Sequence, residues 1–296
     1  MGFRSATACC ETSPETEVET AVQVVKLGGE LLEEPARVAA LAGRLARLAQ
    51  SAPLAVVHGG GREIDAELSR RGLAKRAVDG LRVTDRATLD AVVAVLGGLV
   101  NTRLVSALVA EGARAVGLTG VDGAWGLAEK APPHQATDGR LIDLGLVGMP
   151  IGQSRTSLLS DLIGLGYVPV VASLGVDAGG QVLNINADTL AAHVASILCA
   201  KTLWVAGSTP GVLDSTGETI ATLTGDEAHA MMADGSASAG MVAKLTACLS
   251  ALDSGVSDVR IIDGRDEELD TAPGTRVMSA DGETGPEPRP SYYLRR

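Results

Sequence analysis

Hydrophobic and polar positions alternate along the chain with two different periods. Short continuous apolar runs that end in glycine or a polar residue predict buried strands, whereas apolar residues repeated every three or four positions predict helices. In segment 35–50, for example, Val38, Leu41, Leu45 and Leu48 fall on one helical stripe. The predicted strands cover 22–27, 54–58, 114–118, 168–172, 202–206 and 258–262, and the predicted helices cover 35–50, 62–71, 86–111, 154–165, 187–200, 226–233 and 238–252.

Strands that alternate with helices in this way predict an α/β fold with a mainly parallel sheet covered on both faces. Residues 120–150 interrupt the alternation with Gly, Pro, Asp and short apolar runs, which predict hairpins or a lid. Segments 1–20 and 280–296 show no periodicity, and we expect disordered tails there. A boundary between two lobes is expected near residues 175–180.

Composition narrows the class of protein. Hydrophobic residues make up 46% of the 296 residues but aromatic residues only 2%, so the core must consist of aliphatic side chains, which suits helices packed on a parallel sheet. The formal net charge of −11 argues against a nucleic-acid partner. Gly, Asn or Arg interrupts the longest apolar stretches, so we expect no membrane span. The four cysteines have no regular spacing, which favours a reducing cytoplasm.

Two predicted strands end in consecutive glycines, at residues 28–29 and 59–61. Ligands of open α/β sheets bind beyond the carboxyl ends of strands, and glycine-rich backbone there can direct N–H groups at phosphate or carboxylate oxygens. Lys26 adds a positive charge before the first of these turns. The alternative is a pair of tight turns that bind no ligand. His58 is interpreted as a packed strand-end residue rather than a catalytic base.

The usual nucleotide-binding signatures are missing: the sequence has no G-x-x-x-x-G-K-[ST] loop, and no G-x-G-x-x-G follows a strand. Lys26 and Lys244 are then the cations of interest. Lys244 falls in the second turn of the predicted helix 238–252, where a positive charge opposes the helix dipole unless an anion lies nearby. The alternative for Lys244 is an ordinary solvated lysine.

Polar residues precede two further helices. Asn184, Asn186 and Asp188 are spaced so that they share one face of an extended chain. Asp188 could also be a helix N-cap, which would leave the two asparagines unexplained. Arg82 precedes the long helix 86–111 and could hold a carboxylate, although an exposed surface arginine is the simpler interpretation.

Taken together, these segments resemble the acetylglutamate kinases of the amino-acid kinase family over about residues 22–278. Arg82 within GLRVTD favours acetylglutamate kinases among related enzymes. The resemblance implies a carbamate kinase-like three-layer αβα sandwich with a mainly parallel central sheet. The matching segments, in order, are VVKLGGE, VVHGGGREID, DGLRVTD, AVGLTGVDG, DLGLVG, GYVPVVASLG, LNINADT, PGVLD, AGMVAKLTACLSAL, VRIIDGR and GTRV.

The resemblance also implies an activity: ATP-dependent phosphorylation, with Mg²⁺, of the side-chain carboxylate of N-acetyl-L-glutamate in arginine biosynthesis. The expected product is N-acetyl-L-glutamyl 5-phosphate. Residues 21–279 would form the kinase domain, with a substrate lobe over about 21–178 and an ATP lobe over about 179–279. The implied site residues are catalytic Lys26, Lys244 and Asp188; substrate-binding Gly60, Gly61, Arg82 and Asn184; and ATP-binding Gly28, Gly29, Gly207, Ser208, Gly211, Gly240 and Met241.

No protein metal ligand is expected. No general base is expected either, because the nucleophile is an ionised carboxylate. Phosphoryl transfer to it requires positioning and charge stabilisation. The resemblance further implies a homodimer. The N-terminal segment lacks the amphipathic helix associated with arginine-inhibited hexamers, so we expect no strong arginine feedback.

The sequence departs from the family pattern at the nucleotide end. Ser208 stands where an acid is expected, and Ala239 replaces a glycine before Met241 and Lys244. Two alternatives therefore stay open. One is a kinase of a related acceptor, such as carrier-protein-bound glutamate or aminoadipate or an analogue from specialised metabolism. The other is a non-catalytic paralogue that binds the metabolite.

Overall fold

The computed structural model describes residues 21–152 and 157–279. The predicted tails, 1–20 and 280–296, and the start of the predicted helix 154–165 lie outside the described residues.

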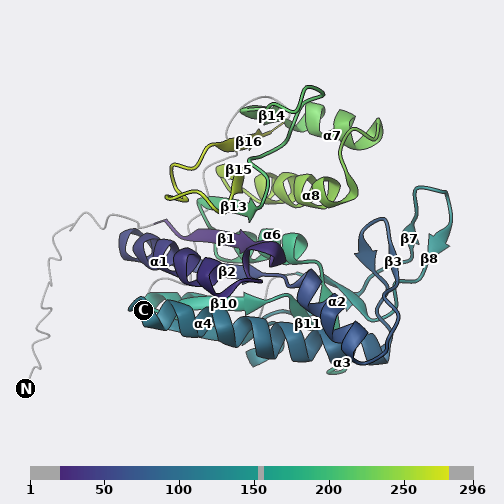
Figure 1. The fold of residues 1–296 in the computed structure, drawn as a ribbon, viewed down its shortest axis with the longest axis horizontal. Helices are drawn as coiled ribbons and strands as arrows, with labels where there is room; N and C mark the ends of the chain where they lie inside the picture. Colours follow the sequence, from purple (N-terminus) through teal and green to yellow (C-terminus); the bar gives the residue numbers. More distant parts are fainter. Residues whose placement is uncertain (1–20, 153–156, 280–296) are drawn as a thin grey trace, which may run out of the picture.

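An eight-stranded sheet forms the centre of the molecule (Figure 1). Strands β15 through β5 of this sheet are parallel, whereas β16 is antiparallel to β15 and β14 is parallel to β16. The mainly parallel sheet is therefore confirmed. Its strands, in spatial order, are β14 (Thr222–Thr224), β16 (Gly274–Met278), β15 (Asp258–Asp263), β13 (Thr202–Gly207), β1 (Gln23–Leu27), β2 (Leu54–His58), β10 (Val168–Ala172) and β5 (Ala115–Thr119).

Helices cover both faces of this sheet, because successive strand side chains point to opposite sides. Val25 packs in one hydrophobic cluster and Val24 in the other, and both side chains are fully buried. The three-layer αβα arrangement is thus confirmed. The Val25 side carries α1 (Pro35–Ser51), α2 (Gly61–Arg70), α3 (Arg86–Val93), η2 (Ala94–Val100) and α4 (Asn101–Ala110), and the Val24 side carries α5 (Leu158–Gly164), α6 (Ala187–Ile197), α7 (Gly225–Ala233) and α8 (Ala239–Asp253).

The segments α3, η2 and α4 form one continuous helix, Arg86–Ala110, in which η2 is π-helical. By length and composition this helix could cross a membrane, contrary to the expectation that glycine and asparagine would interrupt such a span. The helix continues through these residues because one side of it packs into the core. Buried Leu96 and Leu104 show this packing, and 39% of the apolar window is buried.

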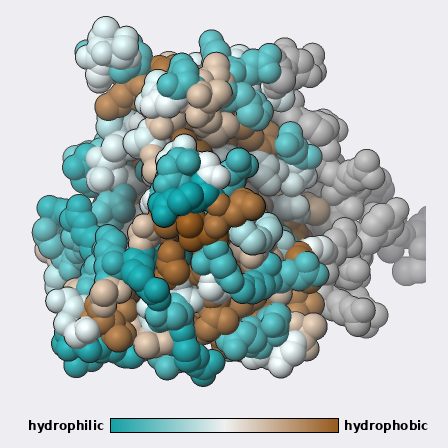
Figure 2. All heavy atoms as spheres, turned by 90° about the vertical axis from the view of Figure 1, so that its right-hand side faces the viewer, coloured by the Kyte–Doolittle hydropathy of each residue, from teal (hydrophilic) through white to brown (hydrophobic). Residues whose placement is uncertain are grey.

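Smaller strands stand beside the main sheet, and hairpins project from it at the right of Figure 1. The hairpins predicted within 120–150 are confirmed, whereas β3, β4, β11, β12, β14 and β16 were not predicted as strands. Figure 2 views this side and shows brown apolar patches within a mostly teal surface. The additional elements are β3 (Ala77–Val78), β4 (Leu81–Arg82), β6 (Ala128–Lys130), β7 (His134–Gln135), β8 (Leu141–Ile142), β9 (Val147–Pro150), β11 (Leu174–Val176), β12 (Val182–Ile185), η1 (Gly29–Leu31) and η3 (Asp122–Ala124).

Candidate active site

The turns that follow β1, β2 and β13 lie next to one another at the carboxyl ends of these strands. The N–H of Gly28 donates to the carbonyl of Ala206 at 2.9 Å. A Cβ placed on Gly29 would lie 2.9 Å from both the Cα of Gly60 and the nitrogen of Gly61, so the two glycine turns are in contact. Any side chain at Gly29 would push them apart. The structure therefore brings the two predicted glycine turns together.

Lys26 and Asp188 form an ion pair with 2.8 Å between Nζ and Oδ1, and their side chains are only 7% and 10% exposed. Lys26 lies on β1, and the alternation along this strand directs its side chain to the face covered by α6 and α8. Burying two charges costs desolvation energy that their attraction only partly offsets, so such a pair is weak support for stability. A functional role explains the pair better.

Asp188 is free to pair with Lys26 because another residue caps α6. The side-chain oxygen of Asn186 accepts hydrogen bonds from the backbone N–H groups of Asp188 and Thr189, at 2.8 and 3.2 Å. The N-cap interpretation of Asp188 is therefore wrong, and the cap is Asn186. This bond fixes the first turn of α6 and, with it, the position of the Asp188 carboxylate.

Lys244 lies in the second turn of α8, half-buried, and forms no ion pair within the described residues. Burial lowers the pKa of Lys244 below its usual value, and the positive charge of Lys26 lowers it further, while Asp188 and Glu30 oppose the shift. A Cβ placed on Gly207 would lie 3.0 Å from Nζ of Lys244. Lys244 thus lies beside the turn after β13 and near Lys26, and a bound anion would stabilise its charge. We use the name cleft for this group of residues together with Asp188 and the two glycine turns.

Ser208, in the turn after β13, is held from two sides. Its N–H donates to Oε1 of Glu30 at 3.2 Å, and its carbonyl accepts from Nη2 of Arg265 at 2.7 Å. Glu30 was not among the predicted site residues. A charged residue directly after the glycine pair 28–29 was the signal in the sequence that could have identified it.

Arg82 is not an exposed surface arginine, since its side chain is only 13% exposed. Its Nη2 donates to Asp65 at 2.5 Å and to the carbonyl of Gly61 at 3.2 Å. Its Nη1 is buried and has no hydrogen-bond partner. Burial raises the pKa of Asp65, but hydrogen bonds from Lys75 and Arg82 outweigh this effect and lower it overall. Arg82 is therefore held in place beside the second glycine turn with one donor group still available.

Asn184 lies on β12 and connects to the same region through Thr84. Its Nδ2 donates to Oγ1 of Thr84 at 3.1 Å, and this hydroxyl donates to the carbonyl of Arg82 at 3.2 Å. Thr84 is fully buried. The structure thus links Asn184 and Arg82 through one buried threonine, although the two residues are far apart in the sequence.

Three other predicted nucleotide-binding residues are Gly240, Met241 and Gly211. Gly240 and Met241 lie in the first turn of α8, before Lys244, and Met241 also packs against the core. Gly211 has a φ of 142°, and a Cβ there would lie 2.6 Å from Oγ1 of Thr275. Packing against β16 is sufficient to explain the glycine at 211.

His58 is fully buried at the end of β2. Its Nε2 lies 3.0 Å from Nδ2 of Asn101, and its Nδ1 lies 3.0 Å from the carbonyl of Gly59. The amide NH₂ of Asn101 donates, so Nε2 accepts and Nδ1 carries the proton. Burial lowers the pKa of His58 to about 4. The structure therefore favours the interpretation of His58 as a packed, neutral residue.

Residues 21–152 and 157–279 contain no group of three or more His, Cys, Asp or Glu side chains that could hold a metal ion. Mg²⁺ usually binds through one or two carboxylates together with substrate phosphates. The two carboxylates that oppose the pKa shift of Lys244 are those of Asp188 and Glu30. Asp188 is already paired with Lys26, so the half-buried Glu30 carboxylate is the group that fits a Mg²⁺ ion arriving with a nucleotide.

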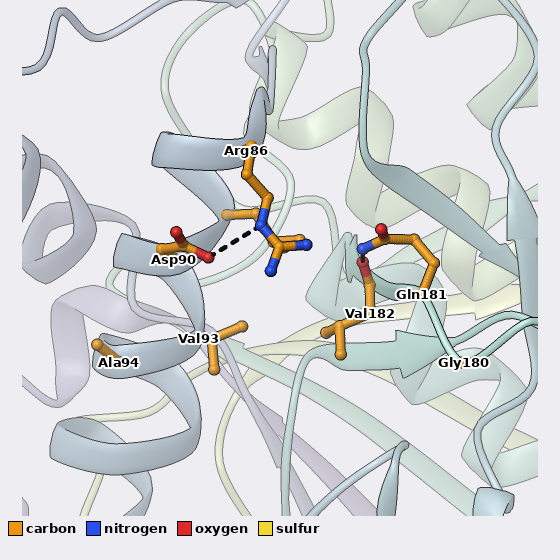
Figure 3. A pocket seen from close by; sticks show the side chains of 8 residues that line it. Arg86, Asp90, Val93, Ala94, Gly180, Gln181 and Val182 are labelled. Atoms are coloured by element: carbon orange, nitrogen blue, oxygen red, sulfur yellow. Dashed lines mark hydrogen bonds and ion pairs between the residues drawn. The ribbon is translucent and has the colours of Figure 1, made fainter.

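A separate surface pocket of about 370 Å³ lies between α3 and the turn that precedes β12 (Figure 3). Arg86 and Asp90, whose closest N–O distance is 3.4 Å, form its polar wall. None of the predicted site residues lines this pocket. Its shape alone assigns it no role.

Comparisons with known proteins agree with this geometry. The model of the family described as "Amino acid kinase family" matches residues 21–263. Acetylglutamate kinase from Nitrobacter winogradskyi is 41% identical over 266 residues, which cover 86% of this chain and 89% of that protein.

Solved structures share the fold. N-acetylglutamate synthase from Neisseria gonorrhoeae, complexed with coenzyme A and N-acetyl-glutamate, superposes with a TM-score of 0.73 at 24% identity. The match covers 87% of this chain, which spans 59% of the length of that chain. Carbamate kinase from Giardia superposes with a TM-score of 0.64 at 14% identity, over 87% of this chain and 98% of that chain.

Proposed function

The chain belongs to the amino acid kinase family, and we propose that it transfers the γ-phosphoryl group of ATP to the side-chain carboxylate of N-acetyl-L-glutamate, in arginine biosynthesis. The observation that carries this proposal is the half-buried Lys244 ammonium, which has no ion-pair partner in the described residues and shares a cleft with the Lys26–Asp188 pair. Such a cation needs an anion, and a phosphoryl group between two lysines supplies one.

The reaction brings two anions together, and the residues of the cleft reduce their repulsion. Lys26 and Lys244 would stabilise the negative charge of the phosphoryl group in the transition state, with Asp188 holding Lys26 in position. The N–H groups of Gly29, Gly60 and Gly61 would orient phosphate and acceptor oxygens, whereas that of Gly28 is already bonded to Ala206. Mg²⁺, when bound with ATP, neutralises part of the phosphate charge.

No residue needs to remove a proton, because the acceptor carboxylate is ionised at neutral pH. His58, the histidine nearest the second glycine turn, is buried, and its low pKa keeps it neutral. The mechanism therefore depends on position and charge.

Arg82 is the proposed clamp for an acceptor carboxylate. Its free Nη1 is buried beside Gly61, and its link to Asp65 keeps the guanidinium in place. A guanidinium N–H suits a carboxylate because the hydrogen bond between them is strengthened by opposite charges. Asn184 is the proposed second contact, through the Thr84 link.

We also propose that most acceptor-binding residues come from the first part of the chain and most nucleotide-binding residues from the second. Of the proposed acceptor-binding residues, Arg82, Gly60 and Gly61 come from about 21–178 and Asn184 from about 179–279. Of the proposed nucleotide-binding residues, Ser208 and Lys244 come from about 179–279, whereas Gly28 and Gly29 come from about 21–178. Gly211, Gly240 and Met241 are assigned to the nucleotide with them. We propose a cytoplasmic homodimer without a nucleic-acid or membrane partner.

The direct test is an assay with purified protein, ATP, Mg²⁺ and candidate acceptors, in which hydroxylamine traps the acyl phosphate. We expect turnover with N-acetyl-L-glutamate. Turnover only with aminoadipate or carrier-bound glutamate would move the activity to a related acceptor. Binding of acetylglutamate without turnover would identify a metabolite-binding paralogue instead.

A further inference from the structure

The carboxylate of Glu30 lies among backbone N–H and lysine groups, which attract anions. Its Oε1 accepts the N–H of Ser208 at 3.2 Å. A Cβ built on Gly207 would lie 3.3 Å from this oxygen and 3.0 Å from Nζ of Lys244, so the carboxylate and the ammonium both lie on the side of Gly207 to which a side chain would project. A backbone N–H and a lysine are the usual contacts of a nucleotide phosphate. Glu30 therefore lies at the phosphate end of the cleft.

The chain makes room for this carboxylate. A Cβ on Gly28 would lie 2.5 Å from Oε2 of Glu30 and closer still to Oε1, so a side chain at position 28 would displace this carboxylate from its place beside Ser208. Glu30 is half-buried and Ser208 is exposed, which leaves the carboxylate accessible from the mouth of the cleft.

The charges around Glu30 leave Lys244 only partly compensated. Lys26 and Asp188 neutralise each other as an ion pair, and the Lys244 ammonium and the Glu30 carboxylate lie on the same side of Gly207 without forming an ion pair in the described residues. Glu30 forms no ion pair within the described residues, and the Ser208 N–H is the hydrogen-bond donor to its carboxylate. Such a carboxylate has oxygen lone pairs available for a hard cation.

Metal-free ATP and Mg²⁺-bound ATP would meet this carboxylate differently. The triphosphate of metal-free ATP carries several negative charges and would be repelled by Glu30 at close range. A nucleotide that carries Mg²⁺ presents a cation for which carboxylate oxygen is a preferred ligand. The described residues provide no three-ligand metal site, so the cation must arrive on the nucleotide.

We infer that Glu30 is the residue by which this cleft selects metal-bound over metal-free nucleotide. This inference rests on the proposed function, since it assumes that the cleft binds ATP. The sequence has Ser208 at a position where an acidic residue is expected. Glu30, in the turn after β1, then supplies an acidic group beside Ser208.

The test measures nucleotide binding by isothermal titration calorimetry without an acceptor, so that it does not depend on turnover. ATP is titrated in EDTA and, separately, with excess MgCl₂, into the wild-type protein and the Glu30→Gln variant. We expect Glu30→Gln to reduce the ratio of Kd for metal-free ATP to Kd for Mg²⁺-bound ATP at least tenfold, mainly through tighter binding of metal-free ATP.

Glu34→Gln is the matched control, because Glu34 is an exposed carboxylate that pairs with Arg37 outside the cleft. We expect it to keep the wild-type ratio. Glu30→Ala provides a second variant, and circular dichroism shows whether each protein is folded.

The calorimetry distinguishes a wrong proposed function from a wrong role of Glu30. If the wild-type protein binds neither form of ATP, the proposed function is wrong. If it binds Mg²⁺-bound ATP and the ratio is the same in wild type, Glu30→Gln and Glu30→Ala, the role of Glu30 is overturned while the proposed function stands. Equal weakening of both nucleotide forms in the variants would also overturn it.

Discussion

Two lysines in one cleft occupy different electrostatic environments. Lys26 is buried and paired with Asp188, whereas Lys244 is half-buried without a partner in the described part of the chain. Asp188 already compensates the charge of Lys26. A bound anion therefore gains most of its electrostatic stabilisation from Lys244. We therefore expect replacement of the two lysines to have different effects on stability. Loss of Lys26 leaves Asp188 as an uncompensated buried charge, which destabilises the fold. Loss of Lys244 leaves the fold intact.

Lys244→Ala should lower kcat by about a hundredfold or more, with a modest change in KM for either substrate. The reason is that its charge acts on the transition state more than on the ground state. Steady-state kinetics measure the effect. Lys201→Ala is the control, since Lys201 is an exposed lysine just before β13 and should retain wild-type kcat. An unchanged kcat in Lys244→Ala would remove this residue from the mechanism.

His58 should make stability fall in mild acid. Its folded-state pKa is about 4, below its ordinary value of 6.5. The unfolded chain therefore binds one more proton at intermediate pH. The stability from a neutral His58 is present above pH 6.5 and is lost as the pH falls toward 4, by about 3 kcal/mol at most.

Urea denaturation at pH 7 and pH 5 measures this effect as a change in the free energy of unfolding. His58→Gln should show a smaller loss of stability between these pH values than the wild-type protein. His229→Gln changes an exposed histidine and controls for the substitution itself. Equal pH dependence in the wild-type protein and His58→Gln would mean that His58 is not the group responsible.

At the scale of elements, the cap of α6 connects stability to the site. Asn186 holds the first turn of α6 through two N–H groups, one of them that of Asp188. Asn186→Ala should lower the free energy of unfolding by about 1 kcal/mol. It should also reduce kcat, because the Asp188 carboxylate loses its fixed position beside Lys26.

Thr224→Ala offers a matched comparison for this prediction. Thr224 caps α7 in a reciprocal capping box with Glu227, and neither residue belongs to the cleft. Its loss should cost a similar amount of stability, measured by urea denaturation, and leave kcat unchanged. If both variants had the same kcat, α6 capping would be a matter of stability alone.

The elements that the sequence predicted well are those with a clear period. The strands at 54–58 and 168–172 have the predicted bounds because continuous apolar runs end there in a polar residue or a turn. The missed strands β11 and β14 have three residues each, too few for a period to show. The long helix was predicted as one element, but its π-helical centre depends on packing and not on local pattern.

Some contacts within the site could not be predicted from the sequence. The resemblance identified Lys26, Lys244, Asp188 and Arg82, and the structure brings the first three together. No local pattern could show that Glu30 lies against Ser208, because that contact depends on the parallel pairing of β1 with β13. Sequence reasoning finds residue types, whereas the sheet determines which residues meet.

At the scale of the whole molecule, the long helix Arg86–Ala110 presents apolar side chains to the surface. Val93, Leu99 and Val109 are 38%, 53% and 56% exposed, although the opposite side of the helix packs in the core. Leaving such side chains in water is unfavourable, and several exposed apolar side chains on one helix make it a candidate interface. We expect a second copy of this chain to cover this face, in line with the proposed homodimer.

Light scattering coupled to size-exclusion chromatography should therefore give a mass of about 60 kDa, twice the 30.1 kDa of one chain. Leu99→Lys should shift the protein toward 30.1 kDa, because a charge buried in an apolar interface is strongly unfavourable. Leu165→Lys is the control, since Leu165 is 65% exposed at the end of α5 and its replacement should not change the mass. A wild-type mass of 30.1 kDa would show that this helix face does not pair two copies, and association with added lipid vesicles would instead assign it to a membrane surface.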